Sequence, residues 1–255
     1  MKYAKTAPVK IVVLGAGGTG GYVIPHLYRL GYAAERPVRI IVCDGDVVEE
    51  KNLIRQNFVE QDVGQNKAQV QAQRYSAAFG IQCEYFPAFI ESEQELLSLT
   101  SPDFVQCRWN NTPETQRVIL LGCVDNNRSR QLCHRIFQQQ KDLIYIDSGN
   151  GEYTGQVVCG VRQKGRTLYK PVGMLYPDVL REEDKFPSEL SCAERTLSAP
   201  QSVTANLMAA TAIAAFLYDL LIEGNLTTRY VSFSSRQINM RAQTVQKRRK
   251  TKRAA

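Results

Sequence analysis

The feature that most constrains the fold is a short apolar run that leads directly into closely spaced glycines. Residues 9–14 read VKIVVL, and glycine then occupies positions 15, 17, 18, 20 and 21. The residues after the glycines carry apolar side chains at helical spacing. A strand, a glycine-rich turn and a helix in this order match the GxGxxG pattern, which brings backbone amides and a helix N-terminus to a phosphate. Taken alone, the pattern fits a redox dinucleotide and ATP equally well.

Strand-like runs and helical patterns alternate through the first 150 residues. This order predicts an α/β fold with a doubly wound, mostly parallel Rossmann-like sheet and helices on both faces. Within the first helix, Pro25 is expected in the first turns and Gly31 at the end. Strands are expected over 9–15, 37–46, 81–90, 117–127 and 142–150, and helices over 20–32, 66–80 and 128–140.

The pattern changes after about residue 150. A hairpin is expected over 154–170, a long helix over 203–222, and alternating strands over 227–245. These strands are predicted to extend the sheet with antiparallel pairing. A chain of 255 residues buries one sizeable core, so we expect a single domain over residues 1–245, followed by a basic, disordered tail over 246–255.

Much of the net charge of +7 lies in that tail. Six residues between positions 247 and 253 are lysine or arginine. No aromatic residues are interleaved with them, so a solvated tail is favoured over a segment that binds nucleic acid.

The cysteines and the apolar segments indicate the compartment. The seven cysteines form no CxxC pair, and an odd number cannot all pair in internal disulfides. The N-terminus also lacks the apolar core of a secretory signal, so a cytoplasmic protein is expected. The longest apolar segment, 202–224, approaches membrane-spanning length, but Asn206 and Asp219 interrupt it. We expect a buried helix there, in the core or at a subunit interface, and no membrane partner.

Acidic residues follow two of the expected strands. Asp44 lies 24 residues beyond Gly20, where a carboxylate accepts hydrogen bonds from ribose hydroxyls. Asp46 is the second candidate for this role, with a turn-capping role as its alternative. Asp125 ends a later strand and is placed to hold a magnesium ion that bridges phosphate oxygens. Taken alone, Asp125 is better explained as the N-cap of the helix that follows.

A polar loop after the second strand carries Asn52, Arg55, Gln56 and Lys67. A pyrophosphate bridge is served mainly by glycine amides and the helix dipole, whereas a triphosphate with a reacting phosphorus also needs fixed cations. The arginine and the lysine therefore favour ATP over a nicotinamide dinucleotide. Taken alone, each of them is also explained as a surface charge.

The combination of these motifs is more specific than any one of them. GAGGTG, DGD, NLIRQ, GQNKA and CVDNNRSR occur in this order and together resemble the ThiF/MoeB/HesA family, relatives of the ubiquitin-activating enzymes. The resemblance is clear over about residues 10–160. It implies an adenylyltransferase that uses ATP and Mg²⁺ to activate the C-terminal carboxylate of a small partner, with release of pyrophosphate. The implied partner is a ubiquitin-like or sulfur-carrier protein with a C-terminal glycine, or a small peptide.

The resemblance also assigns roles along the chain. Residues 8–150 would bind the nucleotide, residues 151–245 would bind the partner, and relatives of this kind are commonly homodimers. Asp125 would act through Mg²⁺ with Asn126 beside it, and Arg130 is expected to be structural. Arg55, Lys67 and Asp125 would carry the catalysis by neutralising charge and holding the groups in line. The residues expected to contact the nucleotide are Gly15, Gly17, Gly18, Gly20, Asp44, Asp46, Asn52, Arg55, Gln56, Lys67, Asp125 and Asn126.

Cys192 is the expected acceptor of the activated carboxylate. Some relatives pass it to a cysteine in an irregular segment before a late helix, and Cys192 has that placement. Arg195 lies close enough in sequence to favour its thiolate. An ordinary small side chain beneath a loop is the equal alternative. Several relatives hold a structural zinc with two CxxC pairs, which this sequence lacks, so we predict no zinc site.

Two other functions stay open from the sequence. An NAD-dependent oxidoreductase on a Rossmann fold would use the glycine turn but leaves Arg55, Lys67 and Asp125 unexplained. A non-catalytic nucleotide-binding adaptor fits the basic tail and the lack of arginine among the ten residues before Ile11. With only two histidines in the chain, a histidine-based triad or a zinc hydrolase is not expected.

Overall fold

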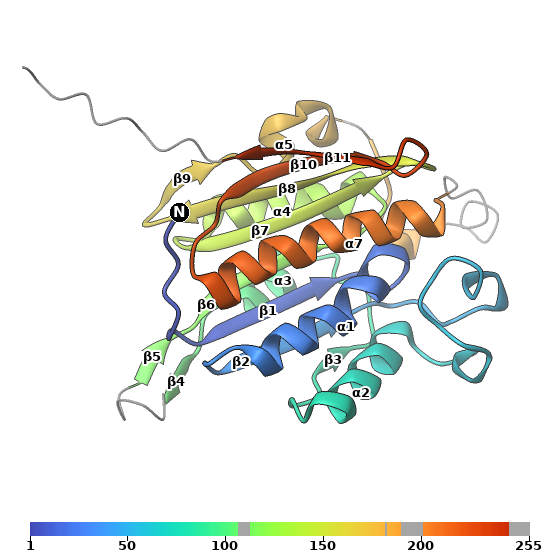
Figure 1. Ribbon diagram of the computed structural model, residues 1–255, viewed down its shortest axis with the longest axis horizontal. Coiled ribbons are helices and arrows are strands. Elements are labelled where there is room, and N and C mark those ends of the chain that lie inside the picture. The colour runs from blue at the N-terminus through green and yellow to red at the C-terminus, as the bar shows by residue number, and fades with distance from the viewer. Residues whose placement is uncertain (107–112, 182, 190–200, 245–255) are drawn as a thin grey trace, which may run out of the picture.

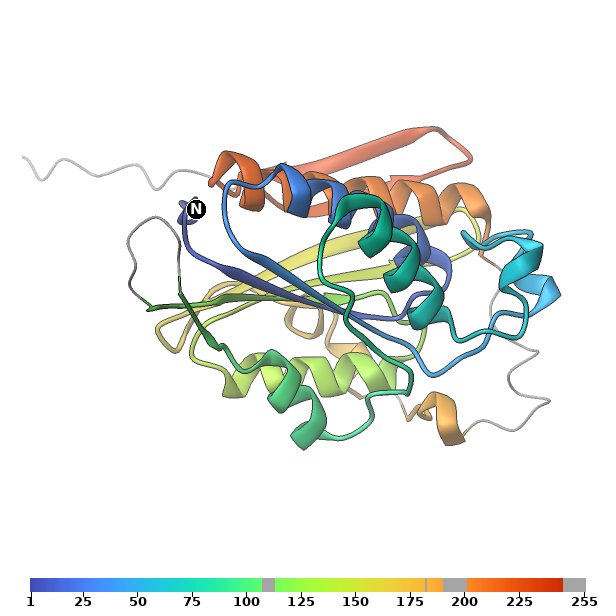
Figure 2. The same ribbon diagram turned by 90° about the horizontal axis from the view of Figure 1, so that it is seen from below.

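The computed structural model describes residues 1–106, 113–181, 183–189 and 201–244. These residues form a nine-stranded sheet with helices on both faces, and a separate two-stranded hairpin (Figures 1 and 2). The α/β class predicted from the sequence is confirmed.

The strands fall into a parallel and an antiparallel part of the sheet. The parallel part consists of β1 (Val9–Leu14), β2 (Val38–Cys43), β3 (Tyr85–Phe86), β6 (Arg117–Gly122) and β7 (Leu143–Asn150). The antiparallel part adds β8 (Thr154–Gln163), β9 (Arg166–Tyr169), β10 (Thr228–Ser234) and β11 (Asn239–Thr244). The order is β11-β10-β8-β7-β6-β1-β2-β3, with β9 paired to β8 outside this path. The separate hairpin pairs β4 (Phe104–Gln106) with β5 (Pro113–Thr115).

The helices cover both faces of this sheet. They are α1 (Gly18–Ala33), α2 (Lys67–Phe79), α3 (Glu93–Thr100), α4 (Asn127–Gln139), α5 (Val172–Leu175) and α7 (Val203–Tyr218). Shorter helical turns span Glu50–Asn52, Glu60–Asp62, Pro177–Leu180, Pro187–Glu189 and Asp219–Glu223. One face carries α1, α2 and α7, and the other carries α3 and α4 (Figure 2).

The central strand β1 explains why the core has two halves. All six of its residues are buried. Successive side chains of a strand point to opposite faces, so Val9, Ile11 and Val13 join the core under α1 and α7. Val12 and Leu14 join the second core under α3 and α4. A parallel strand with helices on both faces of the sheet is buried in this way. Loops lie beside its carboxyl end.

The long apolar segment near residue 210 is a core helix. Val203–Glu223 is long and apolar enough to cross a membrane by length and composition, and more than half of its most apolar part is buried within the protein. It packs against α1, β7, β8 and β10. Burial against these elements explains the apolar inner face of the helix, whereas Leu207 and Tyr218 on its other face are exposed.

Helix α1 extends slightly beyond the expected range at both ends. It starts at Gly18 and runs to Ala33, with Pro25 in its second turn as expected. Gly31, the expected end of the helix, lies within its last turn, so that expectation was wrong. A Cβ atom at position 31 would lie 3.2 Å from Ile81 Cδ1 and 3.4 Å from Val38 Cγ1. Gly31 therefore serves close packing of α1 on the sheet and does not end the helix.

The strand expected over 81–90 was mostly wrong. Only Tyr85 and Phe86 pair with β2, at the edge of the sheet. Pro87 follows and has no N–H to continue the ladder. Helix α3 comes next and begins with a capping box, in which Ser92 Oγ accepts from the Glu95 amide at 3.2 Å and the Glu95 carboxylate accepts from the Ser92 amide.

The turn after β1 is closed so tightly that two of its positions exclude a side chain. Gly15 has a φ of +92°, and a Cβ atom there would lie 2.5 Å from the Cys123 carbonyl oxygen. A Cβ atom at Gly20 would lie only 1.9 Å from the Gly15 carbonyl oxygen. The glycines thus let the first turn of α1 pack directly on the ends of β1 and β6.

This packing predicts that Gly20→Ala destabilises the protein. The added methyl group meets backbone, which must shift, at a cost of about 2 kcal/mol. We expect the Tm to fall by roughly 4–8 °C in a thermal denaturation experiment.

Gly151→Ala is the matched control. A Cβ atom at that position has no neighbour closer than 3.7 Å. The control should keep the wild-type Tm within about 2 °C. A Gly20→Ala protein as stable as this control would contradict the proposed close approach.

Candidate functional site

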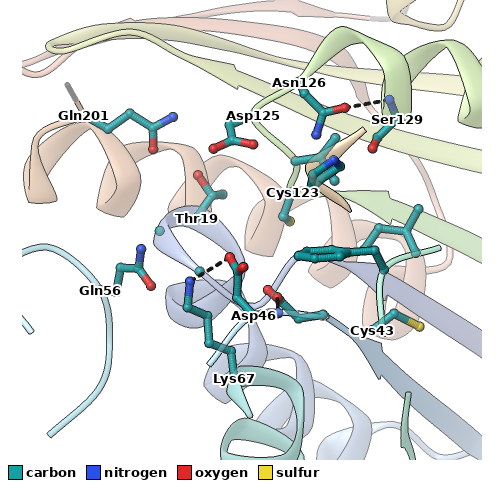
Figure 3. Close-up of a pocket in the computed structure, with 18 of the residues that line it drawn as sticks. Thr19, Cys43, Asp46, Gln56, Lys67, Cys123, Asp125, Asn126, Ser129 and Gln201 are labelled. Atoms are coloured by element: carbon teal, nitrogen blue, oxygen red, sulfur yellow. Dashed lines mark hydrogen bonds and ion pairs between the residues drawn. The ribbon is translucent and has the colours of Figure 1, made fainter. Parts of the chain in front are cut away.

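A cavity of about 400 Å³ lies at the carboxyl ends of β1, β2, β6 and β7 (Figure 3). This is the edge of a parallel sheet at which ligands bind in folds of this class. Eleven of the predicted site residues line the cavity: Gly15, Gly17, Gly18, Asp44, Asp46, Asn52, Arg55, Gln56, Lys67, Asp125 and Asn126. The structure therefore brings together groups that are spread over more than a hundred positions of the sequence.

Two predicted site residues are not among them. Gly20 does not line the cavity. It lies against the Gly15 carbonyl and so has a packing role, and its expected contact with a nucleotide stays a prediction. Cys192 lies outside the described residues, and its role stays a prediction.

Asp44 is a buried carboxylate held from two sides. Its Oδ2 atom accepts from the Ala16 amide at 2.7 Å, and its Oδ1 atom accepts from the Asp46 amide at 2.8 Å. Burial raises the pKa of Asp44 to about 6, against the opposing effect of Lys67. The remaining lone pairs of a carboxylate fixed in this way are suited to accept from vicinal hydroxyl groups.

Lys67 and Asp46 form an ion pair on one wall of the cavity. The distance from Lys67 Nζ to Asp46 Oδ2 is 3.0 Å (Figure 3). The lysine side chain is only 8% exposed, whereas the aspartate side chain is 45% exposed. The carboxylate of Asp46, the second candidate for binding the ribose, is thus paired with Lys67.

Asn66 ties these residues together. Its side-chain oxygen caps α2 by accepting from the Gln69 amide at 3.0 Å. Its Nδ2 atom donates to the carbonyl oxygens of Asp44 at 2.8 Å and of Asp46 at 3.1 Å. The end of β2 and the start of α2 are therefore joined by one side chain.

The loop over Asp46–Asn66 presents three further predicted residues. Asn52 is buried, and its side-chain oxygen accepts from the Glu49 amide at 3.0 Å. Gln56 is buried too, and its Oε1 atom has no hydrogen-bond partner among the described residues. Arg55 is half-buried and forms no ion pair within the described part of the chain. This side of the cavity therefore offers a cation and an amide to a ligand.

Asp125 is not the N-cap of α4. That role belongs to Asn126, whose Oδ1 atom accepts from the Ser129 amide at 2.8 Å. Asp125 is exposed, and its carboxylate lies at the cavity (Figure 3). The N-cap explanation is therefore wrong for Asp125, and its carboxylate is free of that backbone contact.

Arg130 has the structural role expected of it. The buried guanidinium donates to the Val124 carbonyl oxygen at 2.6 Å and to the Ser148 carbonyl oxygen at 3.1 Å. It also contacts Asp147 Oδ1 at 3.3 Å. Arg130 thereby fixes the backbone next to Asp125 against the end of β7.

Several lining residues were missed by the sequence reasoning. Thr19 belongs to the glycine turn and Asn150 ends a strand, so their positions carried a signal. Gln201 and Asp184 come from irregular segments without any motif, and Asp184 reaches the site because its carboxylate accepts from the Asn127 amide at 2.6 Å. Among the described residues, no group of three or more histidine, cysteine, aspartate or glutamate side chains is arranged to hold a metal ion by itself.

Two known proteins are similar to this chain over part of their length. The SUMO-activating enzyme subunit uba-2 of Caenorhabditis elegans is 29% identical over 163 residues, which are 64% of this chain and 25% of that protein. The NEDD8-activating enzyme E1 catalytic subunit of Saccharomyces cerevisiae is 39% identical over 71 residues, which are 28% of this chain and 22% of that protein. The matched parts thus span about a quarter of these relatives.

Solved structures share the fold. MccB of E. coli, solved with ATP, has a TM-score of 0.59 and 21% identity and covers 92% of this chain, which spans 63% of MccB. PaaA has a TM-score of 0.61 and 18% identity, with 92% and 64% covered. The model of the ThiF family matches residues 2–254. Because that match extends over nearly the whole chain, this protein belongs to the ThiF family.

Proposed function

We propose that this protein uses ATP to adenylate the C-terminal carboxylate of a small ubiquitin-like or sulfur-carrier protein, or of a peptide. The observation that carries the proposal is the meeting of Asp44, Arg55, Lys67 and Asp125 with the glycine turn in one cavity. Binding a redox dinucleotide does not require the two cations Arg55 and Lys67 or the carboxylate of Asp125 beside its phosphates. The names of the relatives support the same chemistry, since two are subunits of SUMO- and NEDD8-activating enzymes and MccB was solved with AMPCPP and MccA.

In the proposed reaction a carboxylate oxygen forms a bond to the α-phosphorus of ATP. The bond between the α-phosphorus and the oxygen that bridges to the β-phosphate breaks, and pyrophosphate leaves with the electron pair. Asp44 orients the ribose by accepting from its hydroxyls. Arg55 and Lys67 offset the negative charge that builds up on the departing pyrophosphate.

The exposed carboxylate of Asp125 would hold a Mg²⁺ ion at the cavity together with phosphate oxygens of ATP. Such an ion would neutralise phosphate charge and lower the repulsion of the attacking carboxylate. The proposed ligand set is one protein carboxylate, completed by phosphate oxygens of ATP.

Three further assignments belong to the proposal. We infer a cytoplasmic homodimer, for which the exposed Leu207 and Tyr218 of the apolar helix α7 are candidate contacts. We also infer that Cys192 accepts the activated carboxylate as a thioester, with release of AMP. The Cys192 thiol loses its proton to solvent and its sulfur bonds to the acyl carbon. The bond from that carbon to the phosphate oxygen breaks, and AMP leaves with the electron pair.

The test of the function is ATP–pyrophosphate exchange against a panel of glycine-terminated ubiquitin-like proteins and short peptides. We expect exchange that depends on one member of the panel. Asp125→Asn should lower its rate by at least about 100-fold, because the metal-bearing charge is lost.

Asp178→Asn is the matched control, since that carboxylate is exposed and does not line the cavity. Its exchange rate should equal that of the wild type. Tight NAD binding without exchange for any panel member would overturn the proposed function in favour of an oxidoreductase.

The raised pKa of Asp44 predicts a pH dependence of nucleoside binding. The ionised carboxylate is the better acceptor for the ribose hydroxyls, so affinity should be full above pH 7 and fall as the pH drops through about 6. Between pH 7.5 and pH 5 we expect the Kd for adenosine to rise roughly tenfold. Adenosine is chosen because it has no phosphate that titrates in this range.

Calorimetric titrations of the wild type and of Asp44→Asn measure this effect. The variant should bind adenosine more weakly at pH 7.5 and show a Kd that is independent of pH. An equal pH dependence in both proteins would rule out Asp44 as its source.

The Cys192 assignment has its own test. With partner and ATP present, the wild type should form an adduct that thiols cleave, and Cys192→Ala should remove this adduct while exchange persists. Cys83→Ala is the control, because Cys83 is a free and exposed cysteine that does not line the cavity. An adduct that survives in Cys192→Ala would assign the acceptor to another residue.

A further inference from the structure

We propose that Thr19 contacts the substrate. Its hydroxyl donates a hydrogen bond to the acyl oxygen of the activated carboxylate. The inference rests on the proposed function and assigns a recognition role that the sequence analysis gave to no residue. It starts from three side chains that lie far apart in the sequence and meet beside the glycine turn: Thr19, Asn150 and Asn206.

Thr19 lies on the wall of the cavity, within the first turn of α1. Asn150 and Gln201 line the cavity as well. In Figure 3 the side chains of Thr19, Asp125 and Gln201 lie on one side, and the Lys67–Asp46 pair lies on the other. The threonine therefore lies across the cavity from Lys67.

The hydrogen bonds fix the threonine oxygen and leave its hydrogen with a poor partner. Asn150 Nδ2 donates to Thr19 Oγ1 at 2.7 Å and to Asn206 Oδ1 at 3.2 Å. The only acceptor for the Thr19 hydroxyl among the described residues is Asn206 Oδ1, at 3.4 Å. Hydroxyl bonds normally measure 2.5–3.0 Å. A ligand oxygen in the cavity would thus be the better acceptor.

Asn206 is the most buried member of this cluster and contacts both Thr19 and Asn150. It is fully buried in α7, and its Nδ2 atom has no hydrogen-bond partner among the described residues. A Cβ atom at Gly18 would lie 2.6 Å from that nitrogen, so only glycine at this position admits the amide. Burying an amide with an unpaired donor costs stability, which indicates that the cluster serves something other than folding.

The direction of attack places the acyl group next to Thr19. An in-line displacement brings the nucleophile to the face of the α-phosphorus opposite the leaving pyrophosphate. Lys67 lies across the cavity from Thr19. With the pyrophosphate on the Lys67 side, the carboxylate enters from the side of Thr19 and Asn150. Thr19 there offers an uncharged donor near the positive end of the α1 dipole, and the N-cap of α1, Gly17, contributes no side chain to fill that position.

The test compares two ligands by titration calorimetry. One is AMP, and the other is glycyl sulfamoyl adenosine, an inert mimic of an acyl adenylate that carries the acyl oxygen. Thr19→Val removes the hydroxyl and keeps the shape. It should weaken binding of the mimic about tenfold, the effect of one hydrogen bond, and change AMP binding less than about twofold.

Two further variants complete the experiment. Thr19→Ser retains the hydroxyl and should restore most of the affinity for the mimic. Thr211→Val is the matched control, because Thr211 is exposed on α7 and bonds only to the Leu207 carbonyl among the described residues. Thermal denaturation checks that each variant folds, and Thr19→Ala replaces Thr19→Val if the valine is not tolerated.

The outcomes separate the two proposals. Equal weakening of AMP and mimic, no weakening, or a wild type that binds the mimic no better than AMP would overturn the role of Thr19. A wild type that binds the mimic through Thr19 and yet shows no exchange would overturn the adenylation function and leave the threonine contact standing.

Discussion

The structure depends on one close backbone approach, between Gly20 in the first turn of α1 and the carbonyl oxygen of Gly15. Because no side chain separates them, α1 begins directly on the end of β1 and its N-terminus opens onto the cavity. The same turn brings the Ala16 amide to Asp44 and leaves room for Asn206 behind Gly18. Glycine here has several different uses: some positions line the cavity, and others let neighbouring elements come close enough to build it.

The candidate site was predictable where its chemistry lies in short, ordered motifs. Asp44, Lys67 and Asp125 follow strand ends or begin a helix, and parallel strands bring their carboxyl ends to one edge. The cluster around Thr19 was not predictable in this way. Its hydrogen bonds join residues that are 131 and 187 positions apart, and no local pattern records which buried amides will meet.

The errors in the fold have local physical causes. The apolar run at 81–90 has strand-like composition, but Pro87 stops the ladder and the sheet ends there, so only two residues pair. The capping box of α3 was present in the sequence as Ser92 and Glu95. Gly31 has the residue type of a helix end, but α1 continues past it to Ala33, and Gly31 packs closely on Ile81 and Val38.

Asn66 has a consequence for the charge of the cavity during the proposed cycle. It joins Asp44 and Asp46 to the start of α2, so the proposed ribose acceptor and Lys67 are held at fixed positions relative to each other. When the β- and γ-phosphates draw Lys67 away from Asp46, that carboxylate remains nearby. Once pyrophosphate leaves, Asp46 is ready to become the partner of the lysine again. In this proposed cycle Asp46 is a counterion for the buried Lys67 ammonium after pyrophosphate has left. The ammonium is then never without a negative partner, and its attraction for the departing pyrophosphate is weaker.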